Sequence, residues 1–260
     1  MLSLKFKKYH YFYGMQWIKT TLILLWKVWF LLMNVISLPF IVPTCVVLIL
    51  LNQYKAFYQT ERLWALFVFY TSGFYFKKEG FSQKLDPTKQ YMVISNHTSV
   101  LDIMIMFILH PRNPIVFVGK SEVKYYPLLG YVFKKAHILV DRKDRNSRMQ
   151  VYDEVKKKVH QGLSICIFPE GGVPDESIQL NKFKDGAFGM AIEHQLPIVI
   201  YTFGDVKKRF PFSLLRGNPG SIRVKKHPII ETKGLIKKDV NRIKEEIYTV
   251  ISKQLKEFDN

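Results

Sequence analysis

The residues of this chain that could do chemistry gather in one short stretch, Ser95 to Asp102. A histidine, His97, and a carboxylate, Asp102, lie five positions apart within it, and apolar runs precede and follow it. This pattern predicts a strand before His97 and a helix from Val100 onward. Five positions in one helix turn through about 500°, so the two side chains meet only if His97 precedes the helix and Asp102 lies in its first turn. A carboxylate holding one imidazole nitrogen would leave the other nitrogen free as a base.

The same stretch also fits a purely structural interpretation. Ser99 is the predicted N-cap of the helix, which places Asp102 at the third helical position. Ser99-x-x-Asp102 is also a capping-box pattern, in which the carboxylate only satisfies the first N–H groups of the helix. From this stretch alone, both interpretations stay open.

Length and composition limit the classes of protein to consider. A chain of 260 residues can bury a sizeable core, as one large domain or one domain with an appendage. Its formal charge of +18 indicates an anionic partner such as a membrane surface, a phosphorylated substrate or nucleic acid. With 48% hydrophobic residues, it is too apolar for a disordered basic tail. Its two cysteines, Cys45 and Cys166, form no disulfide framework or metal-binding spacing.

The N-terminal segment differs in composition from the rest of the chain. Residues 1–60 contain six lysines and no acidic residue, and residues 28–51 carry no charge at all. That uncharged run is long enough to cross a bilayer, but Pro39 and Pro43 interrupt it. It starts too late and runs too long for a cleaved signal peptide.

Three interpretations of this segment follow. It could be a single kinked span with its lysine-rich N-terminus in the cytoplasm, or a bent helix pair that enters one leaflet without crossing. It could also be an internal helix pair of a soluble core. The prolines favour insertion into one leaflet. Residues 61–81, also rich in aromatic side chains, are predicted to form a further helix, and composition changes near residue 82.

Beyond residue 82, short apolar runs alternate with amphipathic stretches. Such alternation predicts an α/β domain with a mixed, largely parallel sheet flanked by helices. The predicted domains are therefore a membrane-associating helical segment, residues 1–81, and an α/β domain, residues 82–260. The predicted strands are residues 91–95, 115–119, 137–140, 164–168, 198–202 and 222–225, and the predicted helices are 100–109, 146–160, 185–194 and 239–258.

Basic residues and glycines follow several of the predicted strands. Lys120 and Arg142 end two strands, and Glu170 and Gly171 follow a third. Open α/β sheets bind ligands at the carboxyl ends of their strands, so Lys120 and Arg142 could converge on one anion. Each residue also has an ordinary explanation as a solvated loop end or a turn. Their occurrence in order on one alternating scaffold favours a binding site.

Four blocks of the sequence resemble those of the glycerolipid acyltransferase family, and in particular its bacterial lysophosphatidic acid acyltransferases. The blocks are the stretch from Asn96 to Asp102, Arg142 after a strand, Phe168 to Gly171, and Leu196 to Val199, within about residues 85–230. There are two departures. Gly172 stands where the family often has threonine, and Ile200-Tyr201 stand where a second proline is common.

The resemblance implies acyl transfer from an acyl thioester, on coenzyme A or acyl carrier protein, to the hydroxyl of 1-acyl-glycerol-3-phosphate. His97 would be the base and Asp102 its orienting partner, Lys120 and Arg142 would hold the phosphate, and Glu170 and Gly171 would lie in the acceptor site. No metal or other cofactor is implied. The expected location is a membrane, with the active site facing the cytoplasm.

Two alternatives remain from the sequence. A related acyltransferase could use another lysolipid or an amino-acid lipid as its acceptor. A basic protein without enzymatic activity could bind membranes or nucleic acid, but the basic residues are scattered and form no nucleic-acid motif interleaved with aromatic residues, so no nucleic acid is expected.

Overall fold

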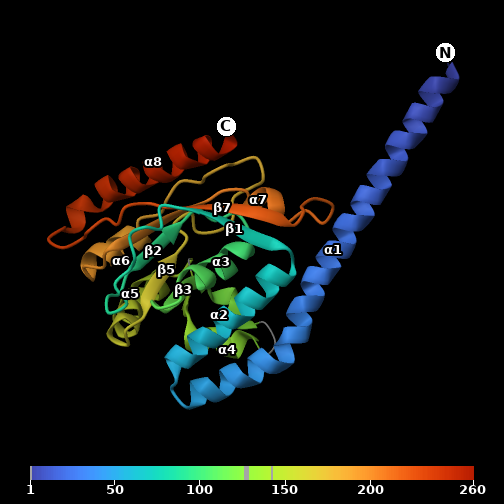
Figure 1. Ribbon diagram of the computed structural model, residues 1–260. Helices are drawn as coiled ribbons and strands as arrows, with labels where there is room; N and C mark the ends of the chain where they lie inside the picture. Colours follow the sequence, from blue (N-terminus) through green and yellow to red (C-terminus); the bar gives the residue numbers. More distant parts are fainter. Residues whose placement is uncertain (1, 126–128, 142) are drawn as a thin grey trace.

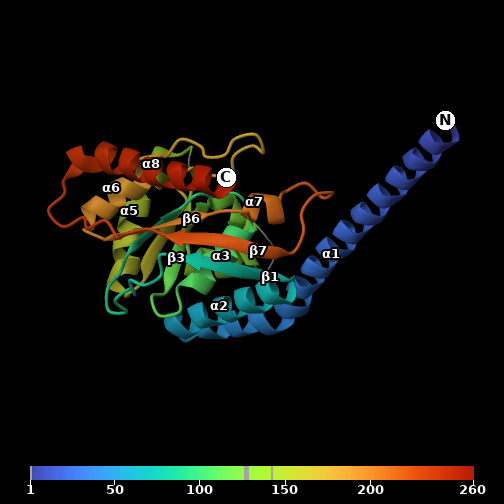
Figure 2. The same ribbon diagram turned by 45° about the horizontal axis from the view of Figure 1, so that its top comes forward.

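A seven-stranded sheet with helices on both faces forms the body of the molecule (Figure 1 and Figure 2). The computed structural model describes residues 2–125, 129–141 and 143–260. The strands are ordered β1-β7-β6-β2-β5-β3-β4, and β6 and β7 pair antiparallel while the other neighbours pair in parallel. This arrangement confirms the predicted fold class. The strands are β1 Phe74–Glu79, β2 Met92–Ser95, β3 Ile115–Lys120, β4 Ile138–Val140, β5 Ser164–Ile167, β6 Ile198–Phe203 and β7 Gly220–Lys226.

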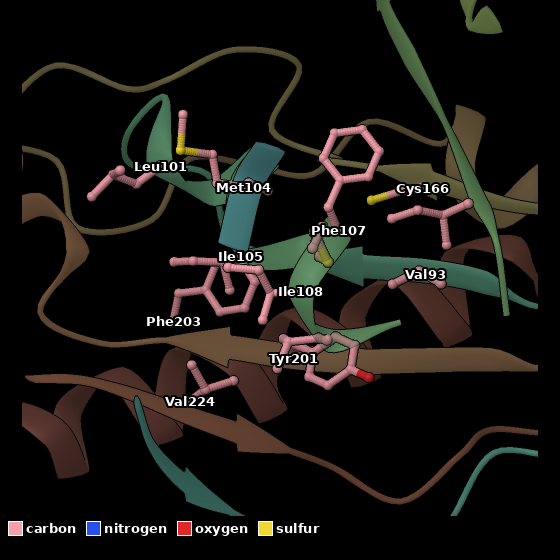
Figure 3. Close-up of a cluster of buried hydrophobic side chains, with 14 of the residues drawn as sticks. Val93, Leu101, Met104, Ile105, Phe107, Ile108, Cys166, Tyr201, Phe203 and Val224 are labelled. Atoms are coloured by element: carbon pink, nitrogen blue, oxygen red, sulfur yellow. The ribbon is translucent and has the colours of Figure 1, made fainter. Parts of the chain in front are cut away.

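The helices form two layers, one on each face of the sheet. Both faces are covered because alternate residues of the central strands point to opposite sides and both sets are apolar. In β2, Val93 packs into a cluster with α2 and α3, whereas Met92 and Ile94 pack into a second cluster with α5, α6 and α8. Figure 3 shows side chains of the first cluster, drawn from α3 and from the strands beneath it. The helices are α1 Leu2–Leu50, α2 Tyr54–Thr71, α3 Leu101–Leu109, α4 Leu129–Ala136, α5 Arg145–His160, α6 Gly186–Glu193, α7 Val206–Arg209 and α8 Val240–Asp259, with 3-10 turns at Ser121–Tyr125 and Lys237–Asp239.

Helix α3, which follows the histidine, is buried along most of its length. Its nine residues are apolar except for Asp102, and eight of the nine are buried. Each large apolar side chain buried in this way stabilises the fold by about 1.5–3 kcal/mol. A helix so fixed between sheet and α2 provides a rigid support for the residues at its N-terminus.

Helix α1 extends away from the domain before it turns beneath it. Within its apolar part, Gln16–Leu50, a window of 18 residues has a mean hydropathy of 2.3 and is only 22% buried, so by length and composition the helix could cross a membrane. Such low burial disfavours the soluble-core interpretation of this segment. The C-terminal part of α1, which contains Pro39 and Pro43, bends to lie beside α2, so the prolines bend the helix without ending it (Figure 1).

The prediction of one helix over residues 61–81 is wrong. Helix α2 ends at Thr71, Gly73 takes a positive φ of 80°, and residues 74–79 form strand β1. β1 pairs in parallel with β7, from Phe74 opposite Gly220 to Glu79 opposite Lys225. Aromatic side chains continue unchanged from α2 into β1, which conceals the change of structure in the sequence. The sheet thus includes residues on the N-terminal side of residue 82.

Candidate active site

His97 and Asp102 meet at the carboxyl end of the central strand β2. His97 lies in the loop of residues 96–100 after β2, here called the histidine loop, and Asp102 is the second residue of α3. His97 Nδ1 lies 2.9 Å from Asp102 Oδ2, and Asp102 is fully buried. The backbone N–H groups of Thr98 and Ser99 also donate to this oxygen, at 2.5 and 2.8 Å. The carboxylate therefore binds the imidazole and two backbone groups at once. This geometry agrees with both interpretations of Asp102, as a helix cap and as the partner of the histidine.

Ser99, the predicted N-cap, makes the hydrogen bonds of a capping box. Its hydroxyl oxygen accepts the Leu101 backbone N–H at 3.4 Å, and its own backbone N–H donates to Asp102 at 2.8 Å. The regular helix α3 begins at Leu101, one residue later than predicted, although Val100 already has a helical backbone conformation. The Ser99 hydroxyl also donates to the Phe210 carbonyl oxygen at 2.7 Å. Ser99 thus fastens the histidine loop to a distant segment.

The His97 ring has one face covered and one nitrogen free. It stacks on Phe168, with centroids 4.1 Å apart and planes inclined by 11°. Its side chain keeps 16% of its exposure, and Nε2 has no hydrogen-bond partner among the described residues. An imidazole oriented through Nδ1 and open at Nε2 has the geometry of a general base.

Glu170, which follows the neighbouring strand β5, binds the histidine loop. Its Oε1 accepts the His97 backbone N–H at 2.7 Å, and its Oε2 accepts the Asn181 backbone N–H at 2.7 Å. Burial raises the pKa of Glu170 to about 7, against the lowering effect of these two hydrogen bonds. Both carboxylate oxygens thus accept backbone N–H groups, so Glu170 has the geometry of a residue that holds the histidine loop in position.

Asn96 fixes the loop to the strand on the other side, β6. Its amide donates to the Phe203 carbonyl oxygen at 3.0 Å and accepts the Phe203 N–H at 2.8 Å. Asn96 is fully buried. Sequence reasoning assigned it no role, because its partner lies 107 positions away.

Lys120 and Gly171, two of the remaining predicted site residues, lie at the same edge of the sheet. Lys120 is the exposed last residue of β3 and pairs with Val140 of β4. Arg142, two positions beyond Val140, lies outside the described residues. Gly171 has a positive φ of 77°, and the Nζ of Lys184 lies 2.6 Å from where a Cβ on Gly171 would stand. An ammonium group therefore covers the turn after Glu170.

A large cavity opens beside the histidine loop, between α1 and the α/β domain. Its volume is about 1160 Å³, and Thr98, the neighbour of His97, is part of its wall. Leu22 and Trp26 of α1 line one side, and Lys208 and Arg216 lie on the other. The cavity thus offers an apolar wall and a charged wall, which also includes Glu176, Asp205 and Asp259. Among the described residues, no cluster of three or more His, Cys, Asp or Glu could hold a metal ion.

Comparison with known proteins shows which family shares these features. The acyltransferase family model matches residues 78–203, which include His97, Asp102, Lys120, Glu170 and Gly171. These residues are here called the acyltransferase domain, after the family model that they match. The acyltransferase domain begins within β1 and ends with β6, so the partner of Ser99, Phe210, lies beyond it.

Relatives of the acyltransferase domain have closely related names. The 1-acyl-sn-glycerol-3-phosphate acyltransferase of Cocos nucifera is 30% identical over 166 residues, 63% of this chain and 53% of that protein. The human 1-acyl-sn-glycerol-3-phosphate acyltransferase alpha is 28% identical over 195 residues, 73% of this chain and 68% of that protein. The match to the coconut protein thus spans about half of that protein's length.

A solved structure shares the fold over nearly the whole chain. The 1-acyl-sn-glycerophosphate acyltransferase PlsC of Thermotoga maritima superposes with a TM-score of 0.73 at 18% identity. The match covers 94% of this chain and 98% of that one. The shared fold therefore extends beyond the acyltransferase domain.

Proposed function

We propose that this chain transfers a fatty acyl group from an acyl thioester to the free hydroxyl of 1-acyl-glycerol-3-phosphate, giving phosphatidic acid. The observation that carries the proposal is the hydrogen bond of 2.9 Å between His97 Nδ1 and buried Asp102 at the end of the central strand. The names of the relatives support the same reaction and acceptor.

The proposed reaction needs one base and no nucleophile from the protein. His97 Nε2 takes the proton of the acceptor hydroxyl as its oxygen attacks the thioester carbonyl carbon. The tetrahedral adduct then collapses, the carbon–sulfur bond breaks, and His97 returns the proton to the leaving thiolate. Asp102 keeps Nδ1 protonated and stabilises the imidazolium that forms between the two steps.

Binding of the acceptor is assigned to the other predicted site residues. Lys120 and Arg142 hold the phosphate, since cationic side chains at strand ends suit an anionic group. Gly171 lies in the acceptor site. Glu170, whose two oxygens bind backbone N–H groups of the protein, acts there by holding the His97 loop.

The donor and the membrane complete the proposal. The donor is acyl coenzyme A or acyl carrier protein; both are anionic, and the basic chain, with a charge of +18, suits either. Residues 1–81 associate with the membrane and residues 82–260 carry the reaction, with the active site facing the cytoplasm. The exposed apolar surface of α1 supports this division, although β1 joins the sheet.

The test is acyl transfer by purified full-length protein with either donor and a panel of lysolipid acceptors. His97→Ala should lower kcat by about 10²–10⁴, the usual contribution of a positioned base. His160→Ala, which changes an exposed histidine on α5, is the matched control and should leave kcat unchanged. Undiminished transfer by His97→Ala would exclude this mechanism. Preference for another lysolipid would keep the reaction and replace the acceptor.

A further inference from the structure

Three large apolar side chains stand exposed in one loop outside the acyltransferase domain. Residues 210–217, here called the apolar loop, lie in the connection between α7 and β7. In this loop Phe212, Leu214 and Leu215 are 63%, 69% and 56% exposed. Single exposed apolar residues are ordinary, but three within four positions form a patch that indicates a binding surface.

The apolar loop is fastened to α1. The ammonium of Lys27 donates to the carbonyl oxygens of Pro211 (3.1 Å) and Ser213. Phe210 packs on two α1 side chains, with ring centroids 5.7 Å from Trp26 and 4.4 Å from Phe30. Figure 1 and Figure 2 both show this loop, in orange between α7 and β7, projecting toward α1. The loop is therefore held beside a helix whose apolar side chains are themselves exposed.

The exposed face of α1 next to the loop is also apolar. Leu24 and Leu31, which lie one turn from Lys27 on the same side of the helix, are 38% and 62% exposed. Apolar side chains are therefore exposed on both elements, the apolar loop and α1, near the place where the two contact each other.

All charged residues of α7 and the apolar loop are positively charged. Residues 206–217 contain Lys207, Lys208, Arg209 and Arg216 and no acidic residue. Lys208 and Arg216 are exposed, although Arg216 pairs with Glu176 at 3.0 Å. Apolar side chains flanked by lysine and arginine suit the surface of an anionic bilayer, where the apolar groups enter the acyl region and the cations meet the headgroups.

We propose that the apolar loop is a second membrane-contacting element, which inserts Phe212, Leu214 and Leu215 into an anionic leaflet beside α1. The proposal rests on the membrane association assigned above and not on acyl transfer. Because Ser99 of the histidine loop donates to the Phe210 carbonyl oxygen, the inserted loop is directly joined to the active site.

Depth-dependent quenching tests the insertion. Leu214→Cys in the full-length chain is labelled with an environment-sensitive fluorophore and reconstituted into phosphatidylcholine–phosphatidylglycerol vesicles containing nitroxide-labelled acyl chains. The two native cysteines, Cys45 and Cys166, are buried, so the reagent is directed to the introduced thiol. Ile236→Cys, at an exposed position just before α8, is the matched control.

Several-fold stronger quenching at position 214 than at position 236 is expected. Equal quenching at the two positions would overturn the proposal, and so would quenching at 214 that is no stronger with phosphatidylglycerol than with phosphatidylcholine alone, since the basic residues would then have no partner. Adding Phe212→Asp and Leu215→Asp to the labelled protein should abolish the quenching at 214 while α1 keeps the protein on the vesicles in flotation. A chain that inserts its loop but transfers no acyl group would refute only the proposed function.

Discussion

At the scale of single residues, the carboxylate of Asp102 has two tasks that a substitution can separate. Asp102 Oδ2 accepts from His97 and two backbone N–H groups, while Oδ1 is buried without a donor among the described residues. In Asp102→Asn, one oxygen can keep the three donors while the negative charge is lost. In Asp102→Ala, both charge and acceptor are lost.

We therefore expect Asp102→Asn to lower kcat by about 10²–10⁴, because the imidazolium loses its counter-charge. Asp102→Ala should lower kcat as much and also destabilise the fold by about 1–3 kcal/mol more, because buried donors lose their acceptor. Initial rates and thermal unfolding of both variants measure the two effects. Equal stability of Asn and Ala variants would contradict a structural task for the carboxylate.

The pKa of Glu170 predicts how stability depends on pH. Burial raises this pKa from an ordinary value of 4.5 to about 7, so between those values the folded protein holds a proton that the unfolded chain has released. The contribution of Glu170 to the free energy of unfolding should consequently fall as pH rises from 4.5 to 7 and level off above it. Glu170→Gln should remove this slope. Thermal unfolding of both proteins across pH 4.5–8 measures it, and parallel curves would refute the assignment.

At the scale of elements, the turn after β5 requires glycine at one position and not at the next. Gly171 has a φ of 77°, and a Cβ there would stand 2.6 Å from the Nζ of Lys184. A Cβ on Gly172 would have no atom within 4 Å. Gly171→Ala should destabilise the protein by about 1–2 kcal/mol, the cost of the left-handed conformation for other residues, and should lower kcat by displacing Glu170. Gly172→Ala is the control, and equal effects in both variants would contradict this account.

The elements also show what a sequence can predict here. The six strands that short apolar runs predicted are present within two residues at each end, because buried parallel strands need such runs. Strand β1 was missed, because its aromatic residues continue those of α2 and its charged end lies at the edge of the sheet. Gly73 was the available signal for a break.

The contacts of the candidate site could likewise be predicted from the sequence only in part. The meeting of His97 with Asp102 followed from local spacing, because both residues lie within one strand-to-helix connection. The hydrogen bonds of Asn96 to Phe203 and of Ser99 to Phe210 join residues 107 and 111 positions apart. Only the strand order brings those pairs together, and no local pattern encodes it.

At the scale of the whole molecule, Trp26 joins α1 to the domain. Its indole N–H donates to the Ser72 carbonyl oxygen at 2.9 Å, and its ring packs edge-on against Phe74 and Phe210. Trp26→Ala should reduce stability by about 2–4 kcal/mol and expose the segment around α1 to protease, because it removes a large contact and a hydrogen bond. Trp17→Ala, at a position 69% exposed, should change stability by less than about 0.5 kcal/mol. Thermal unfolding and limited proteolysis in detergent test this, and similar losses for both would disprove the attachment.

The pairing of β1 with β7 has a consequence for synthesis on the ribosome. Glu79 and its partner Lys225 are 146 positions apart, so β1 leaves the ribosome long before its partner exists. At the usual 5–20 residues per second, the strand waits for about 7–30 s. Through that time its unpaired edge is open to wrong partners, and the adjacent charges of Lys77, Lys78 and Glu79 protect it against them. These three charged residues should therefore reduce mispairing of β1 during synthesis, before β1 forms the edge of the finished sheet.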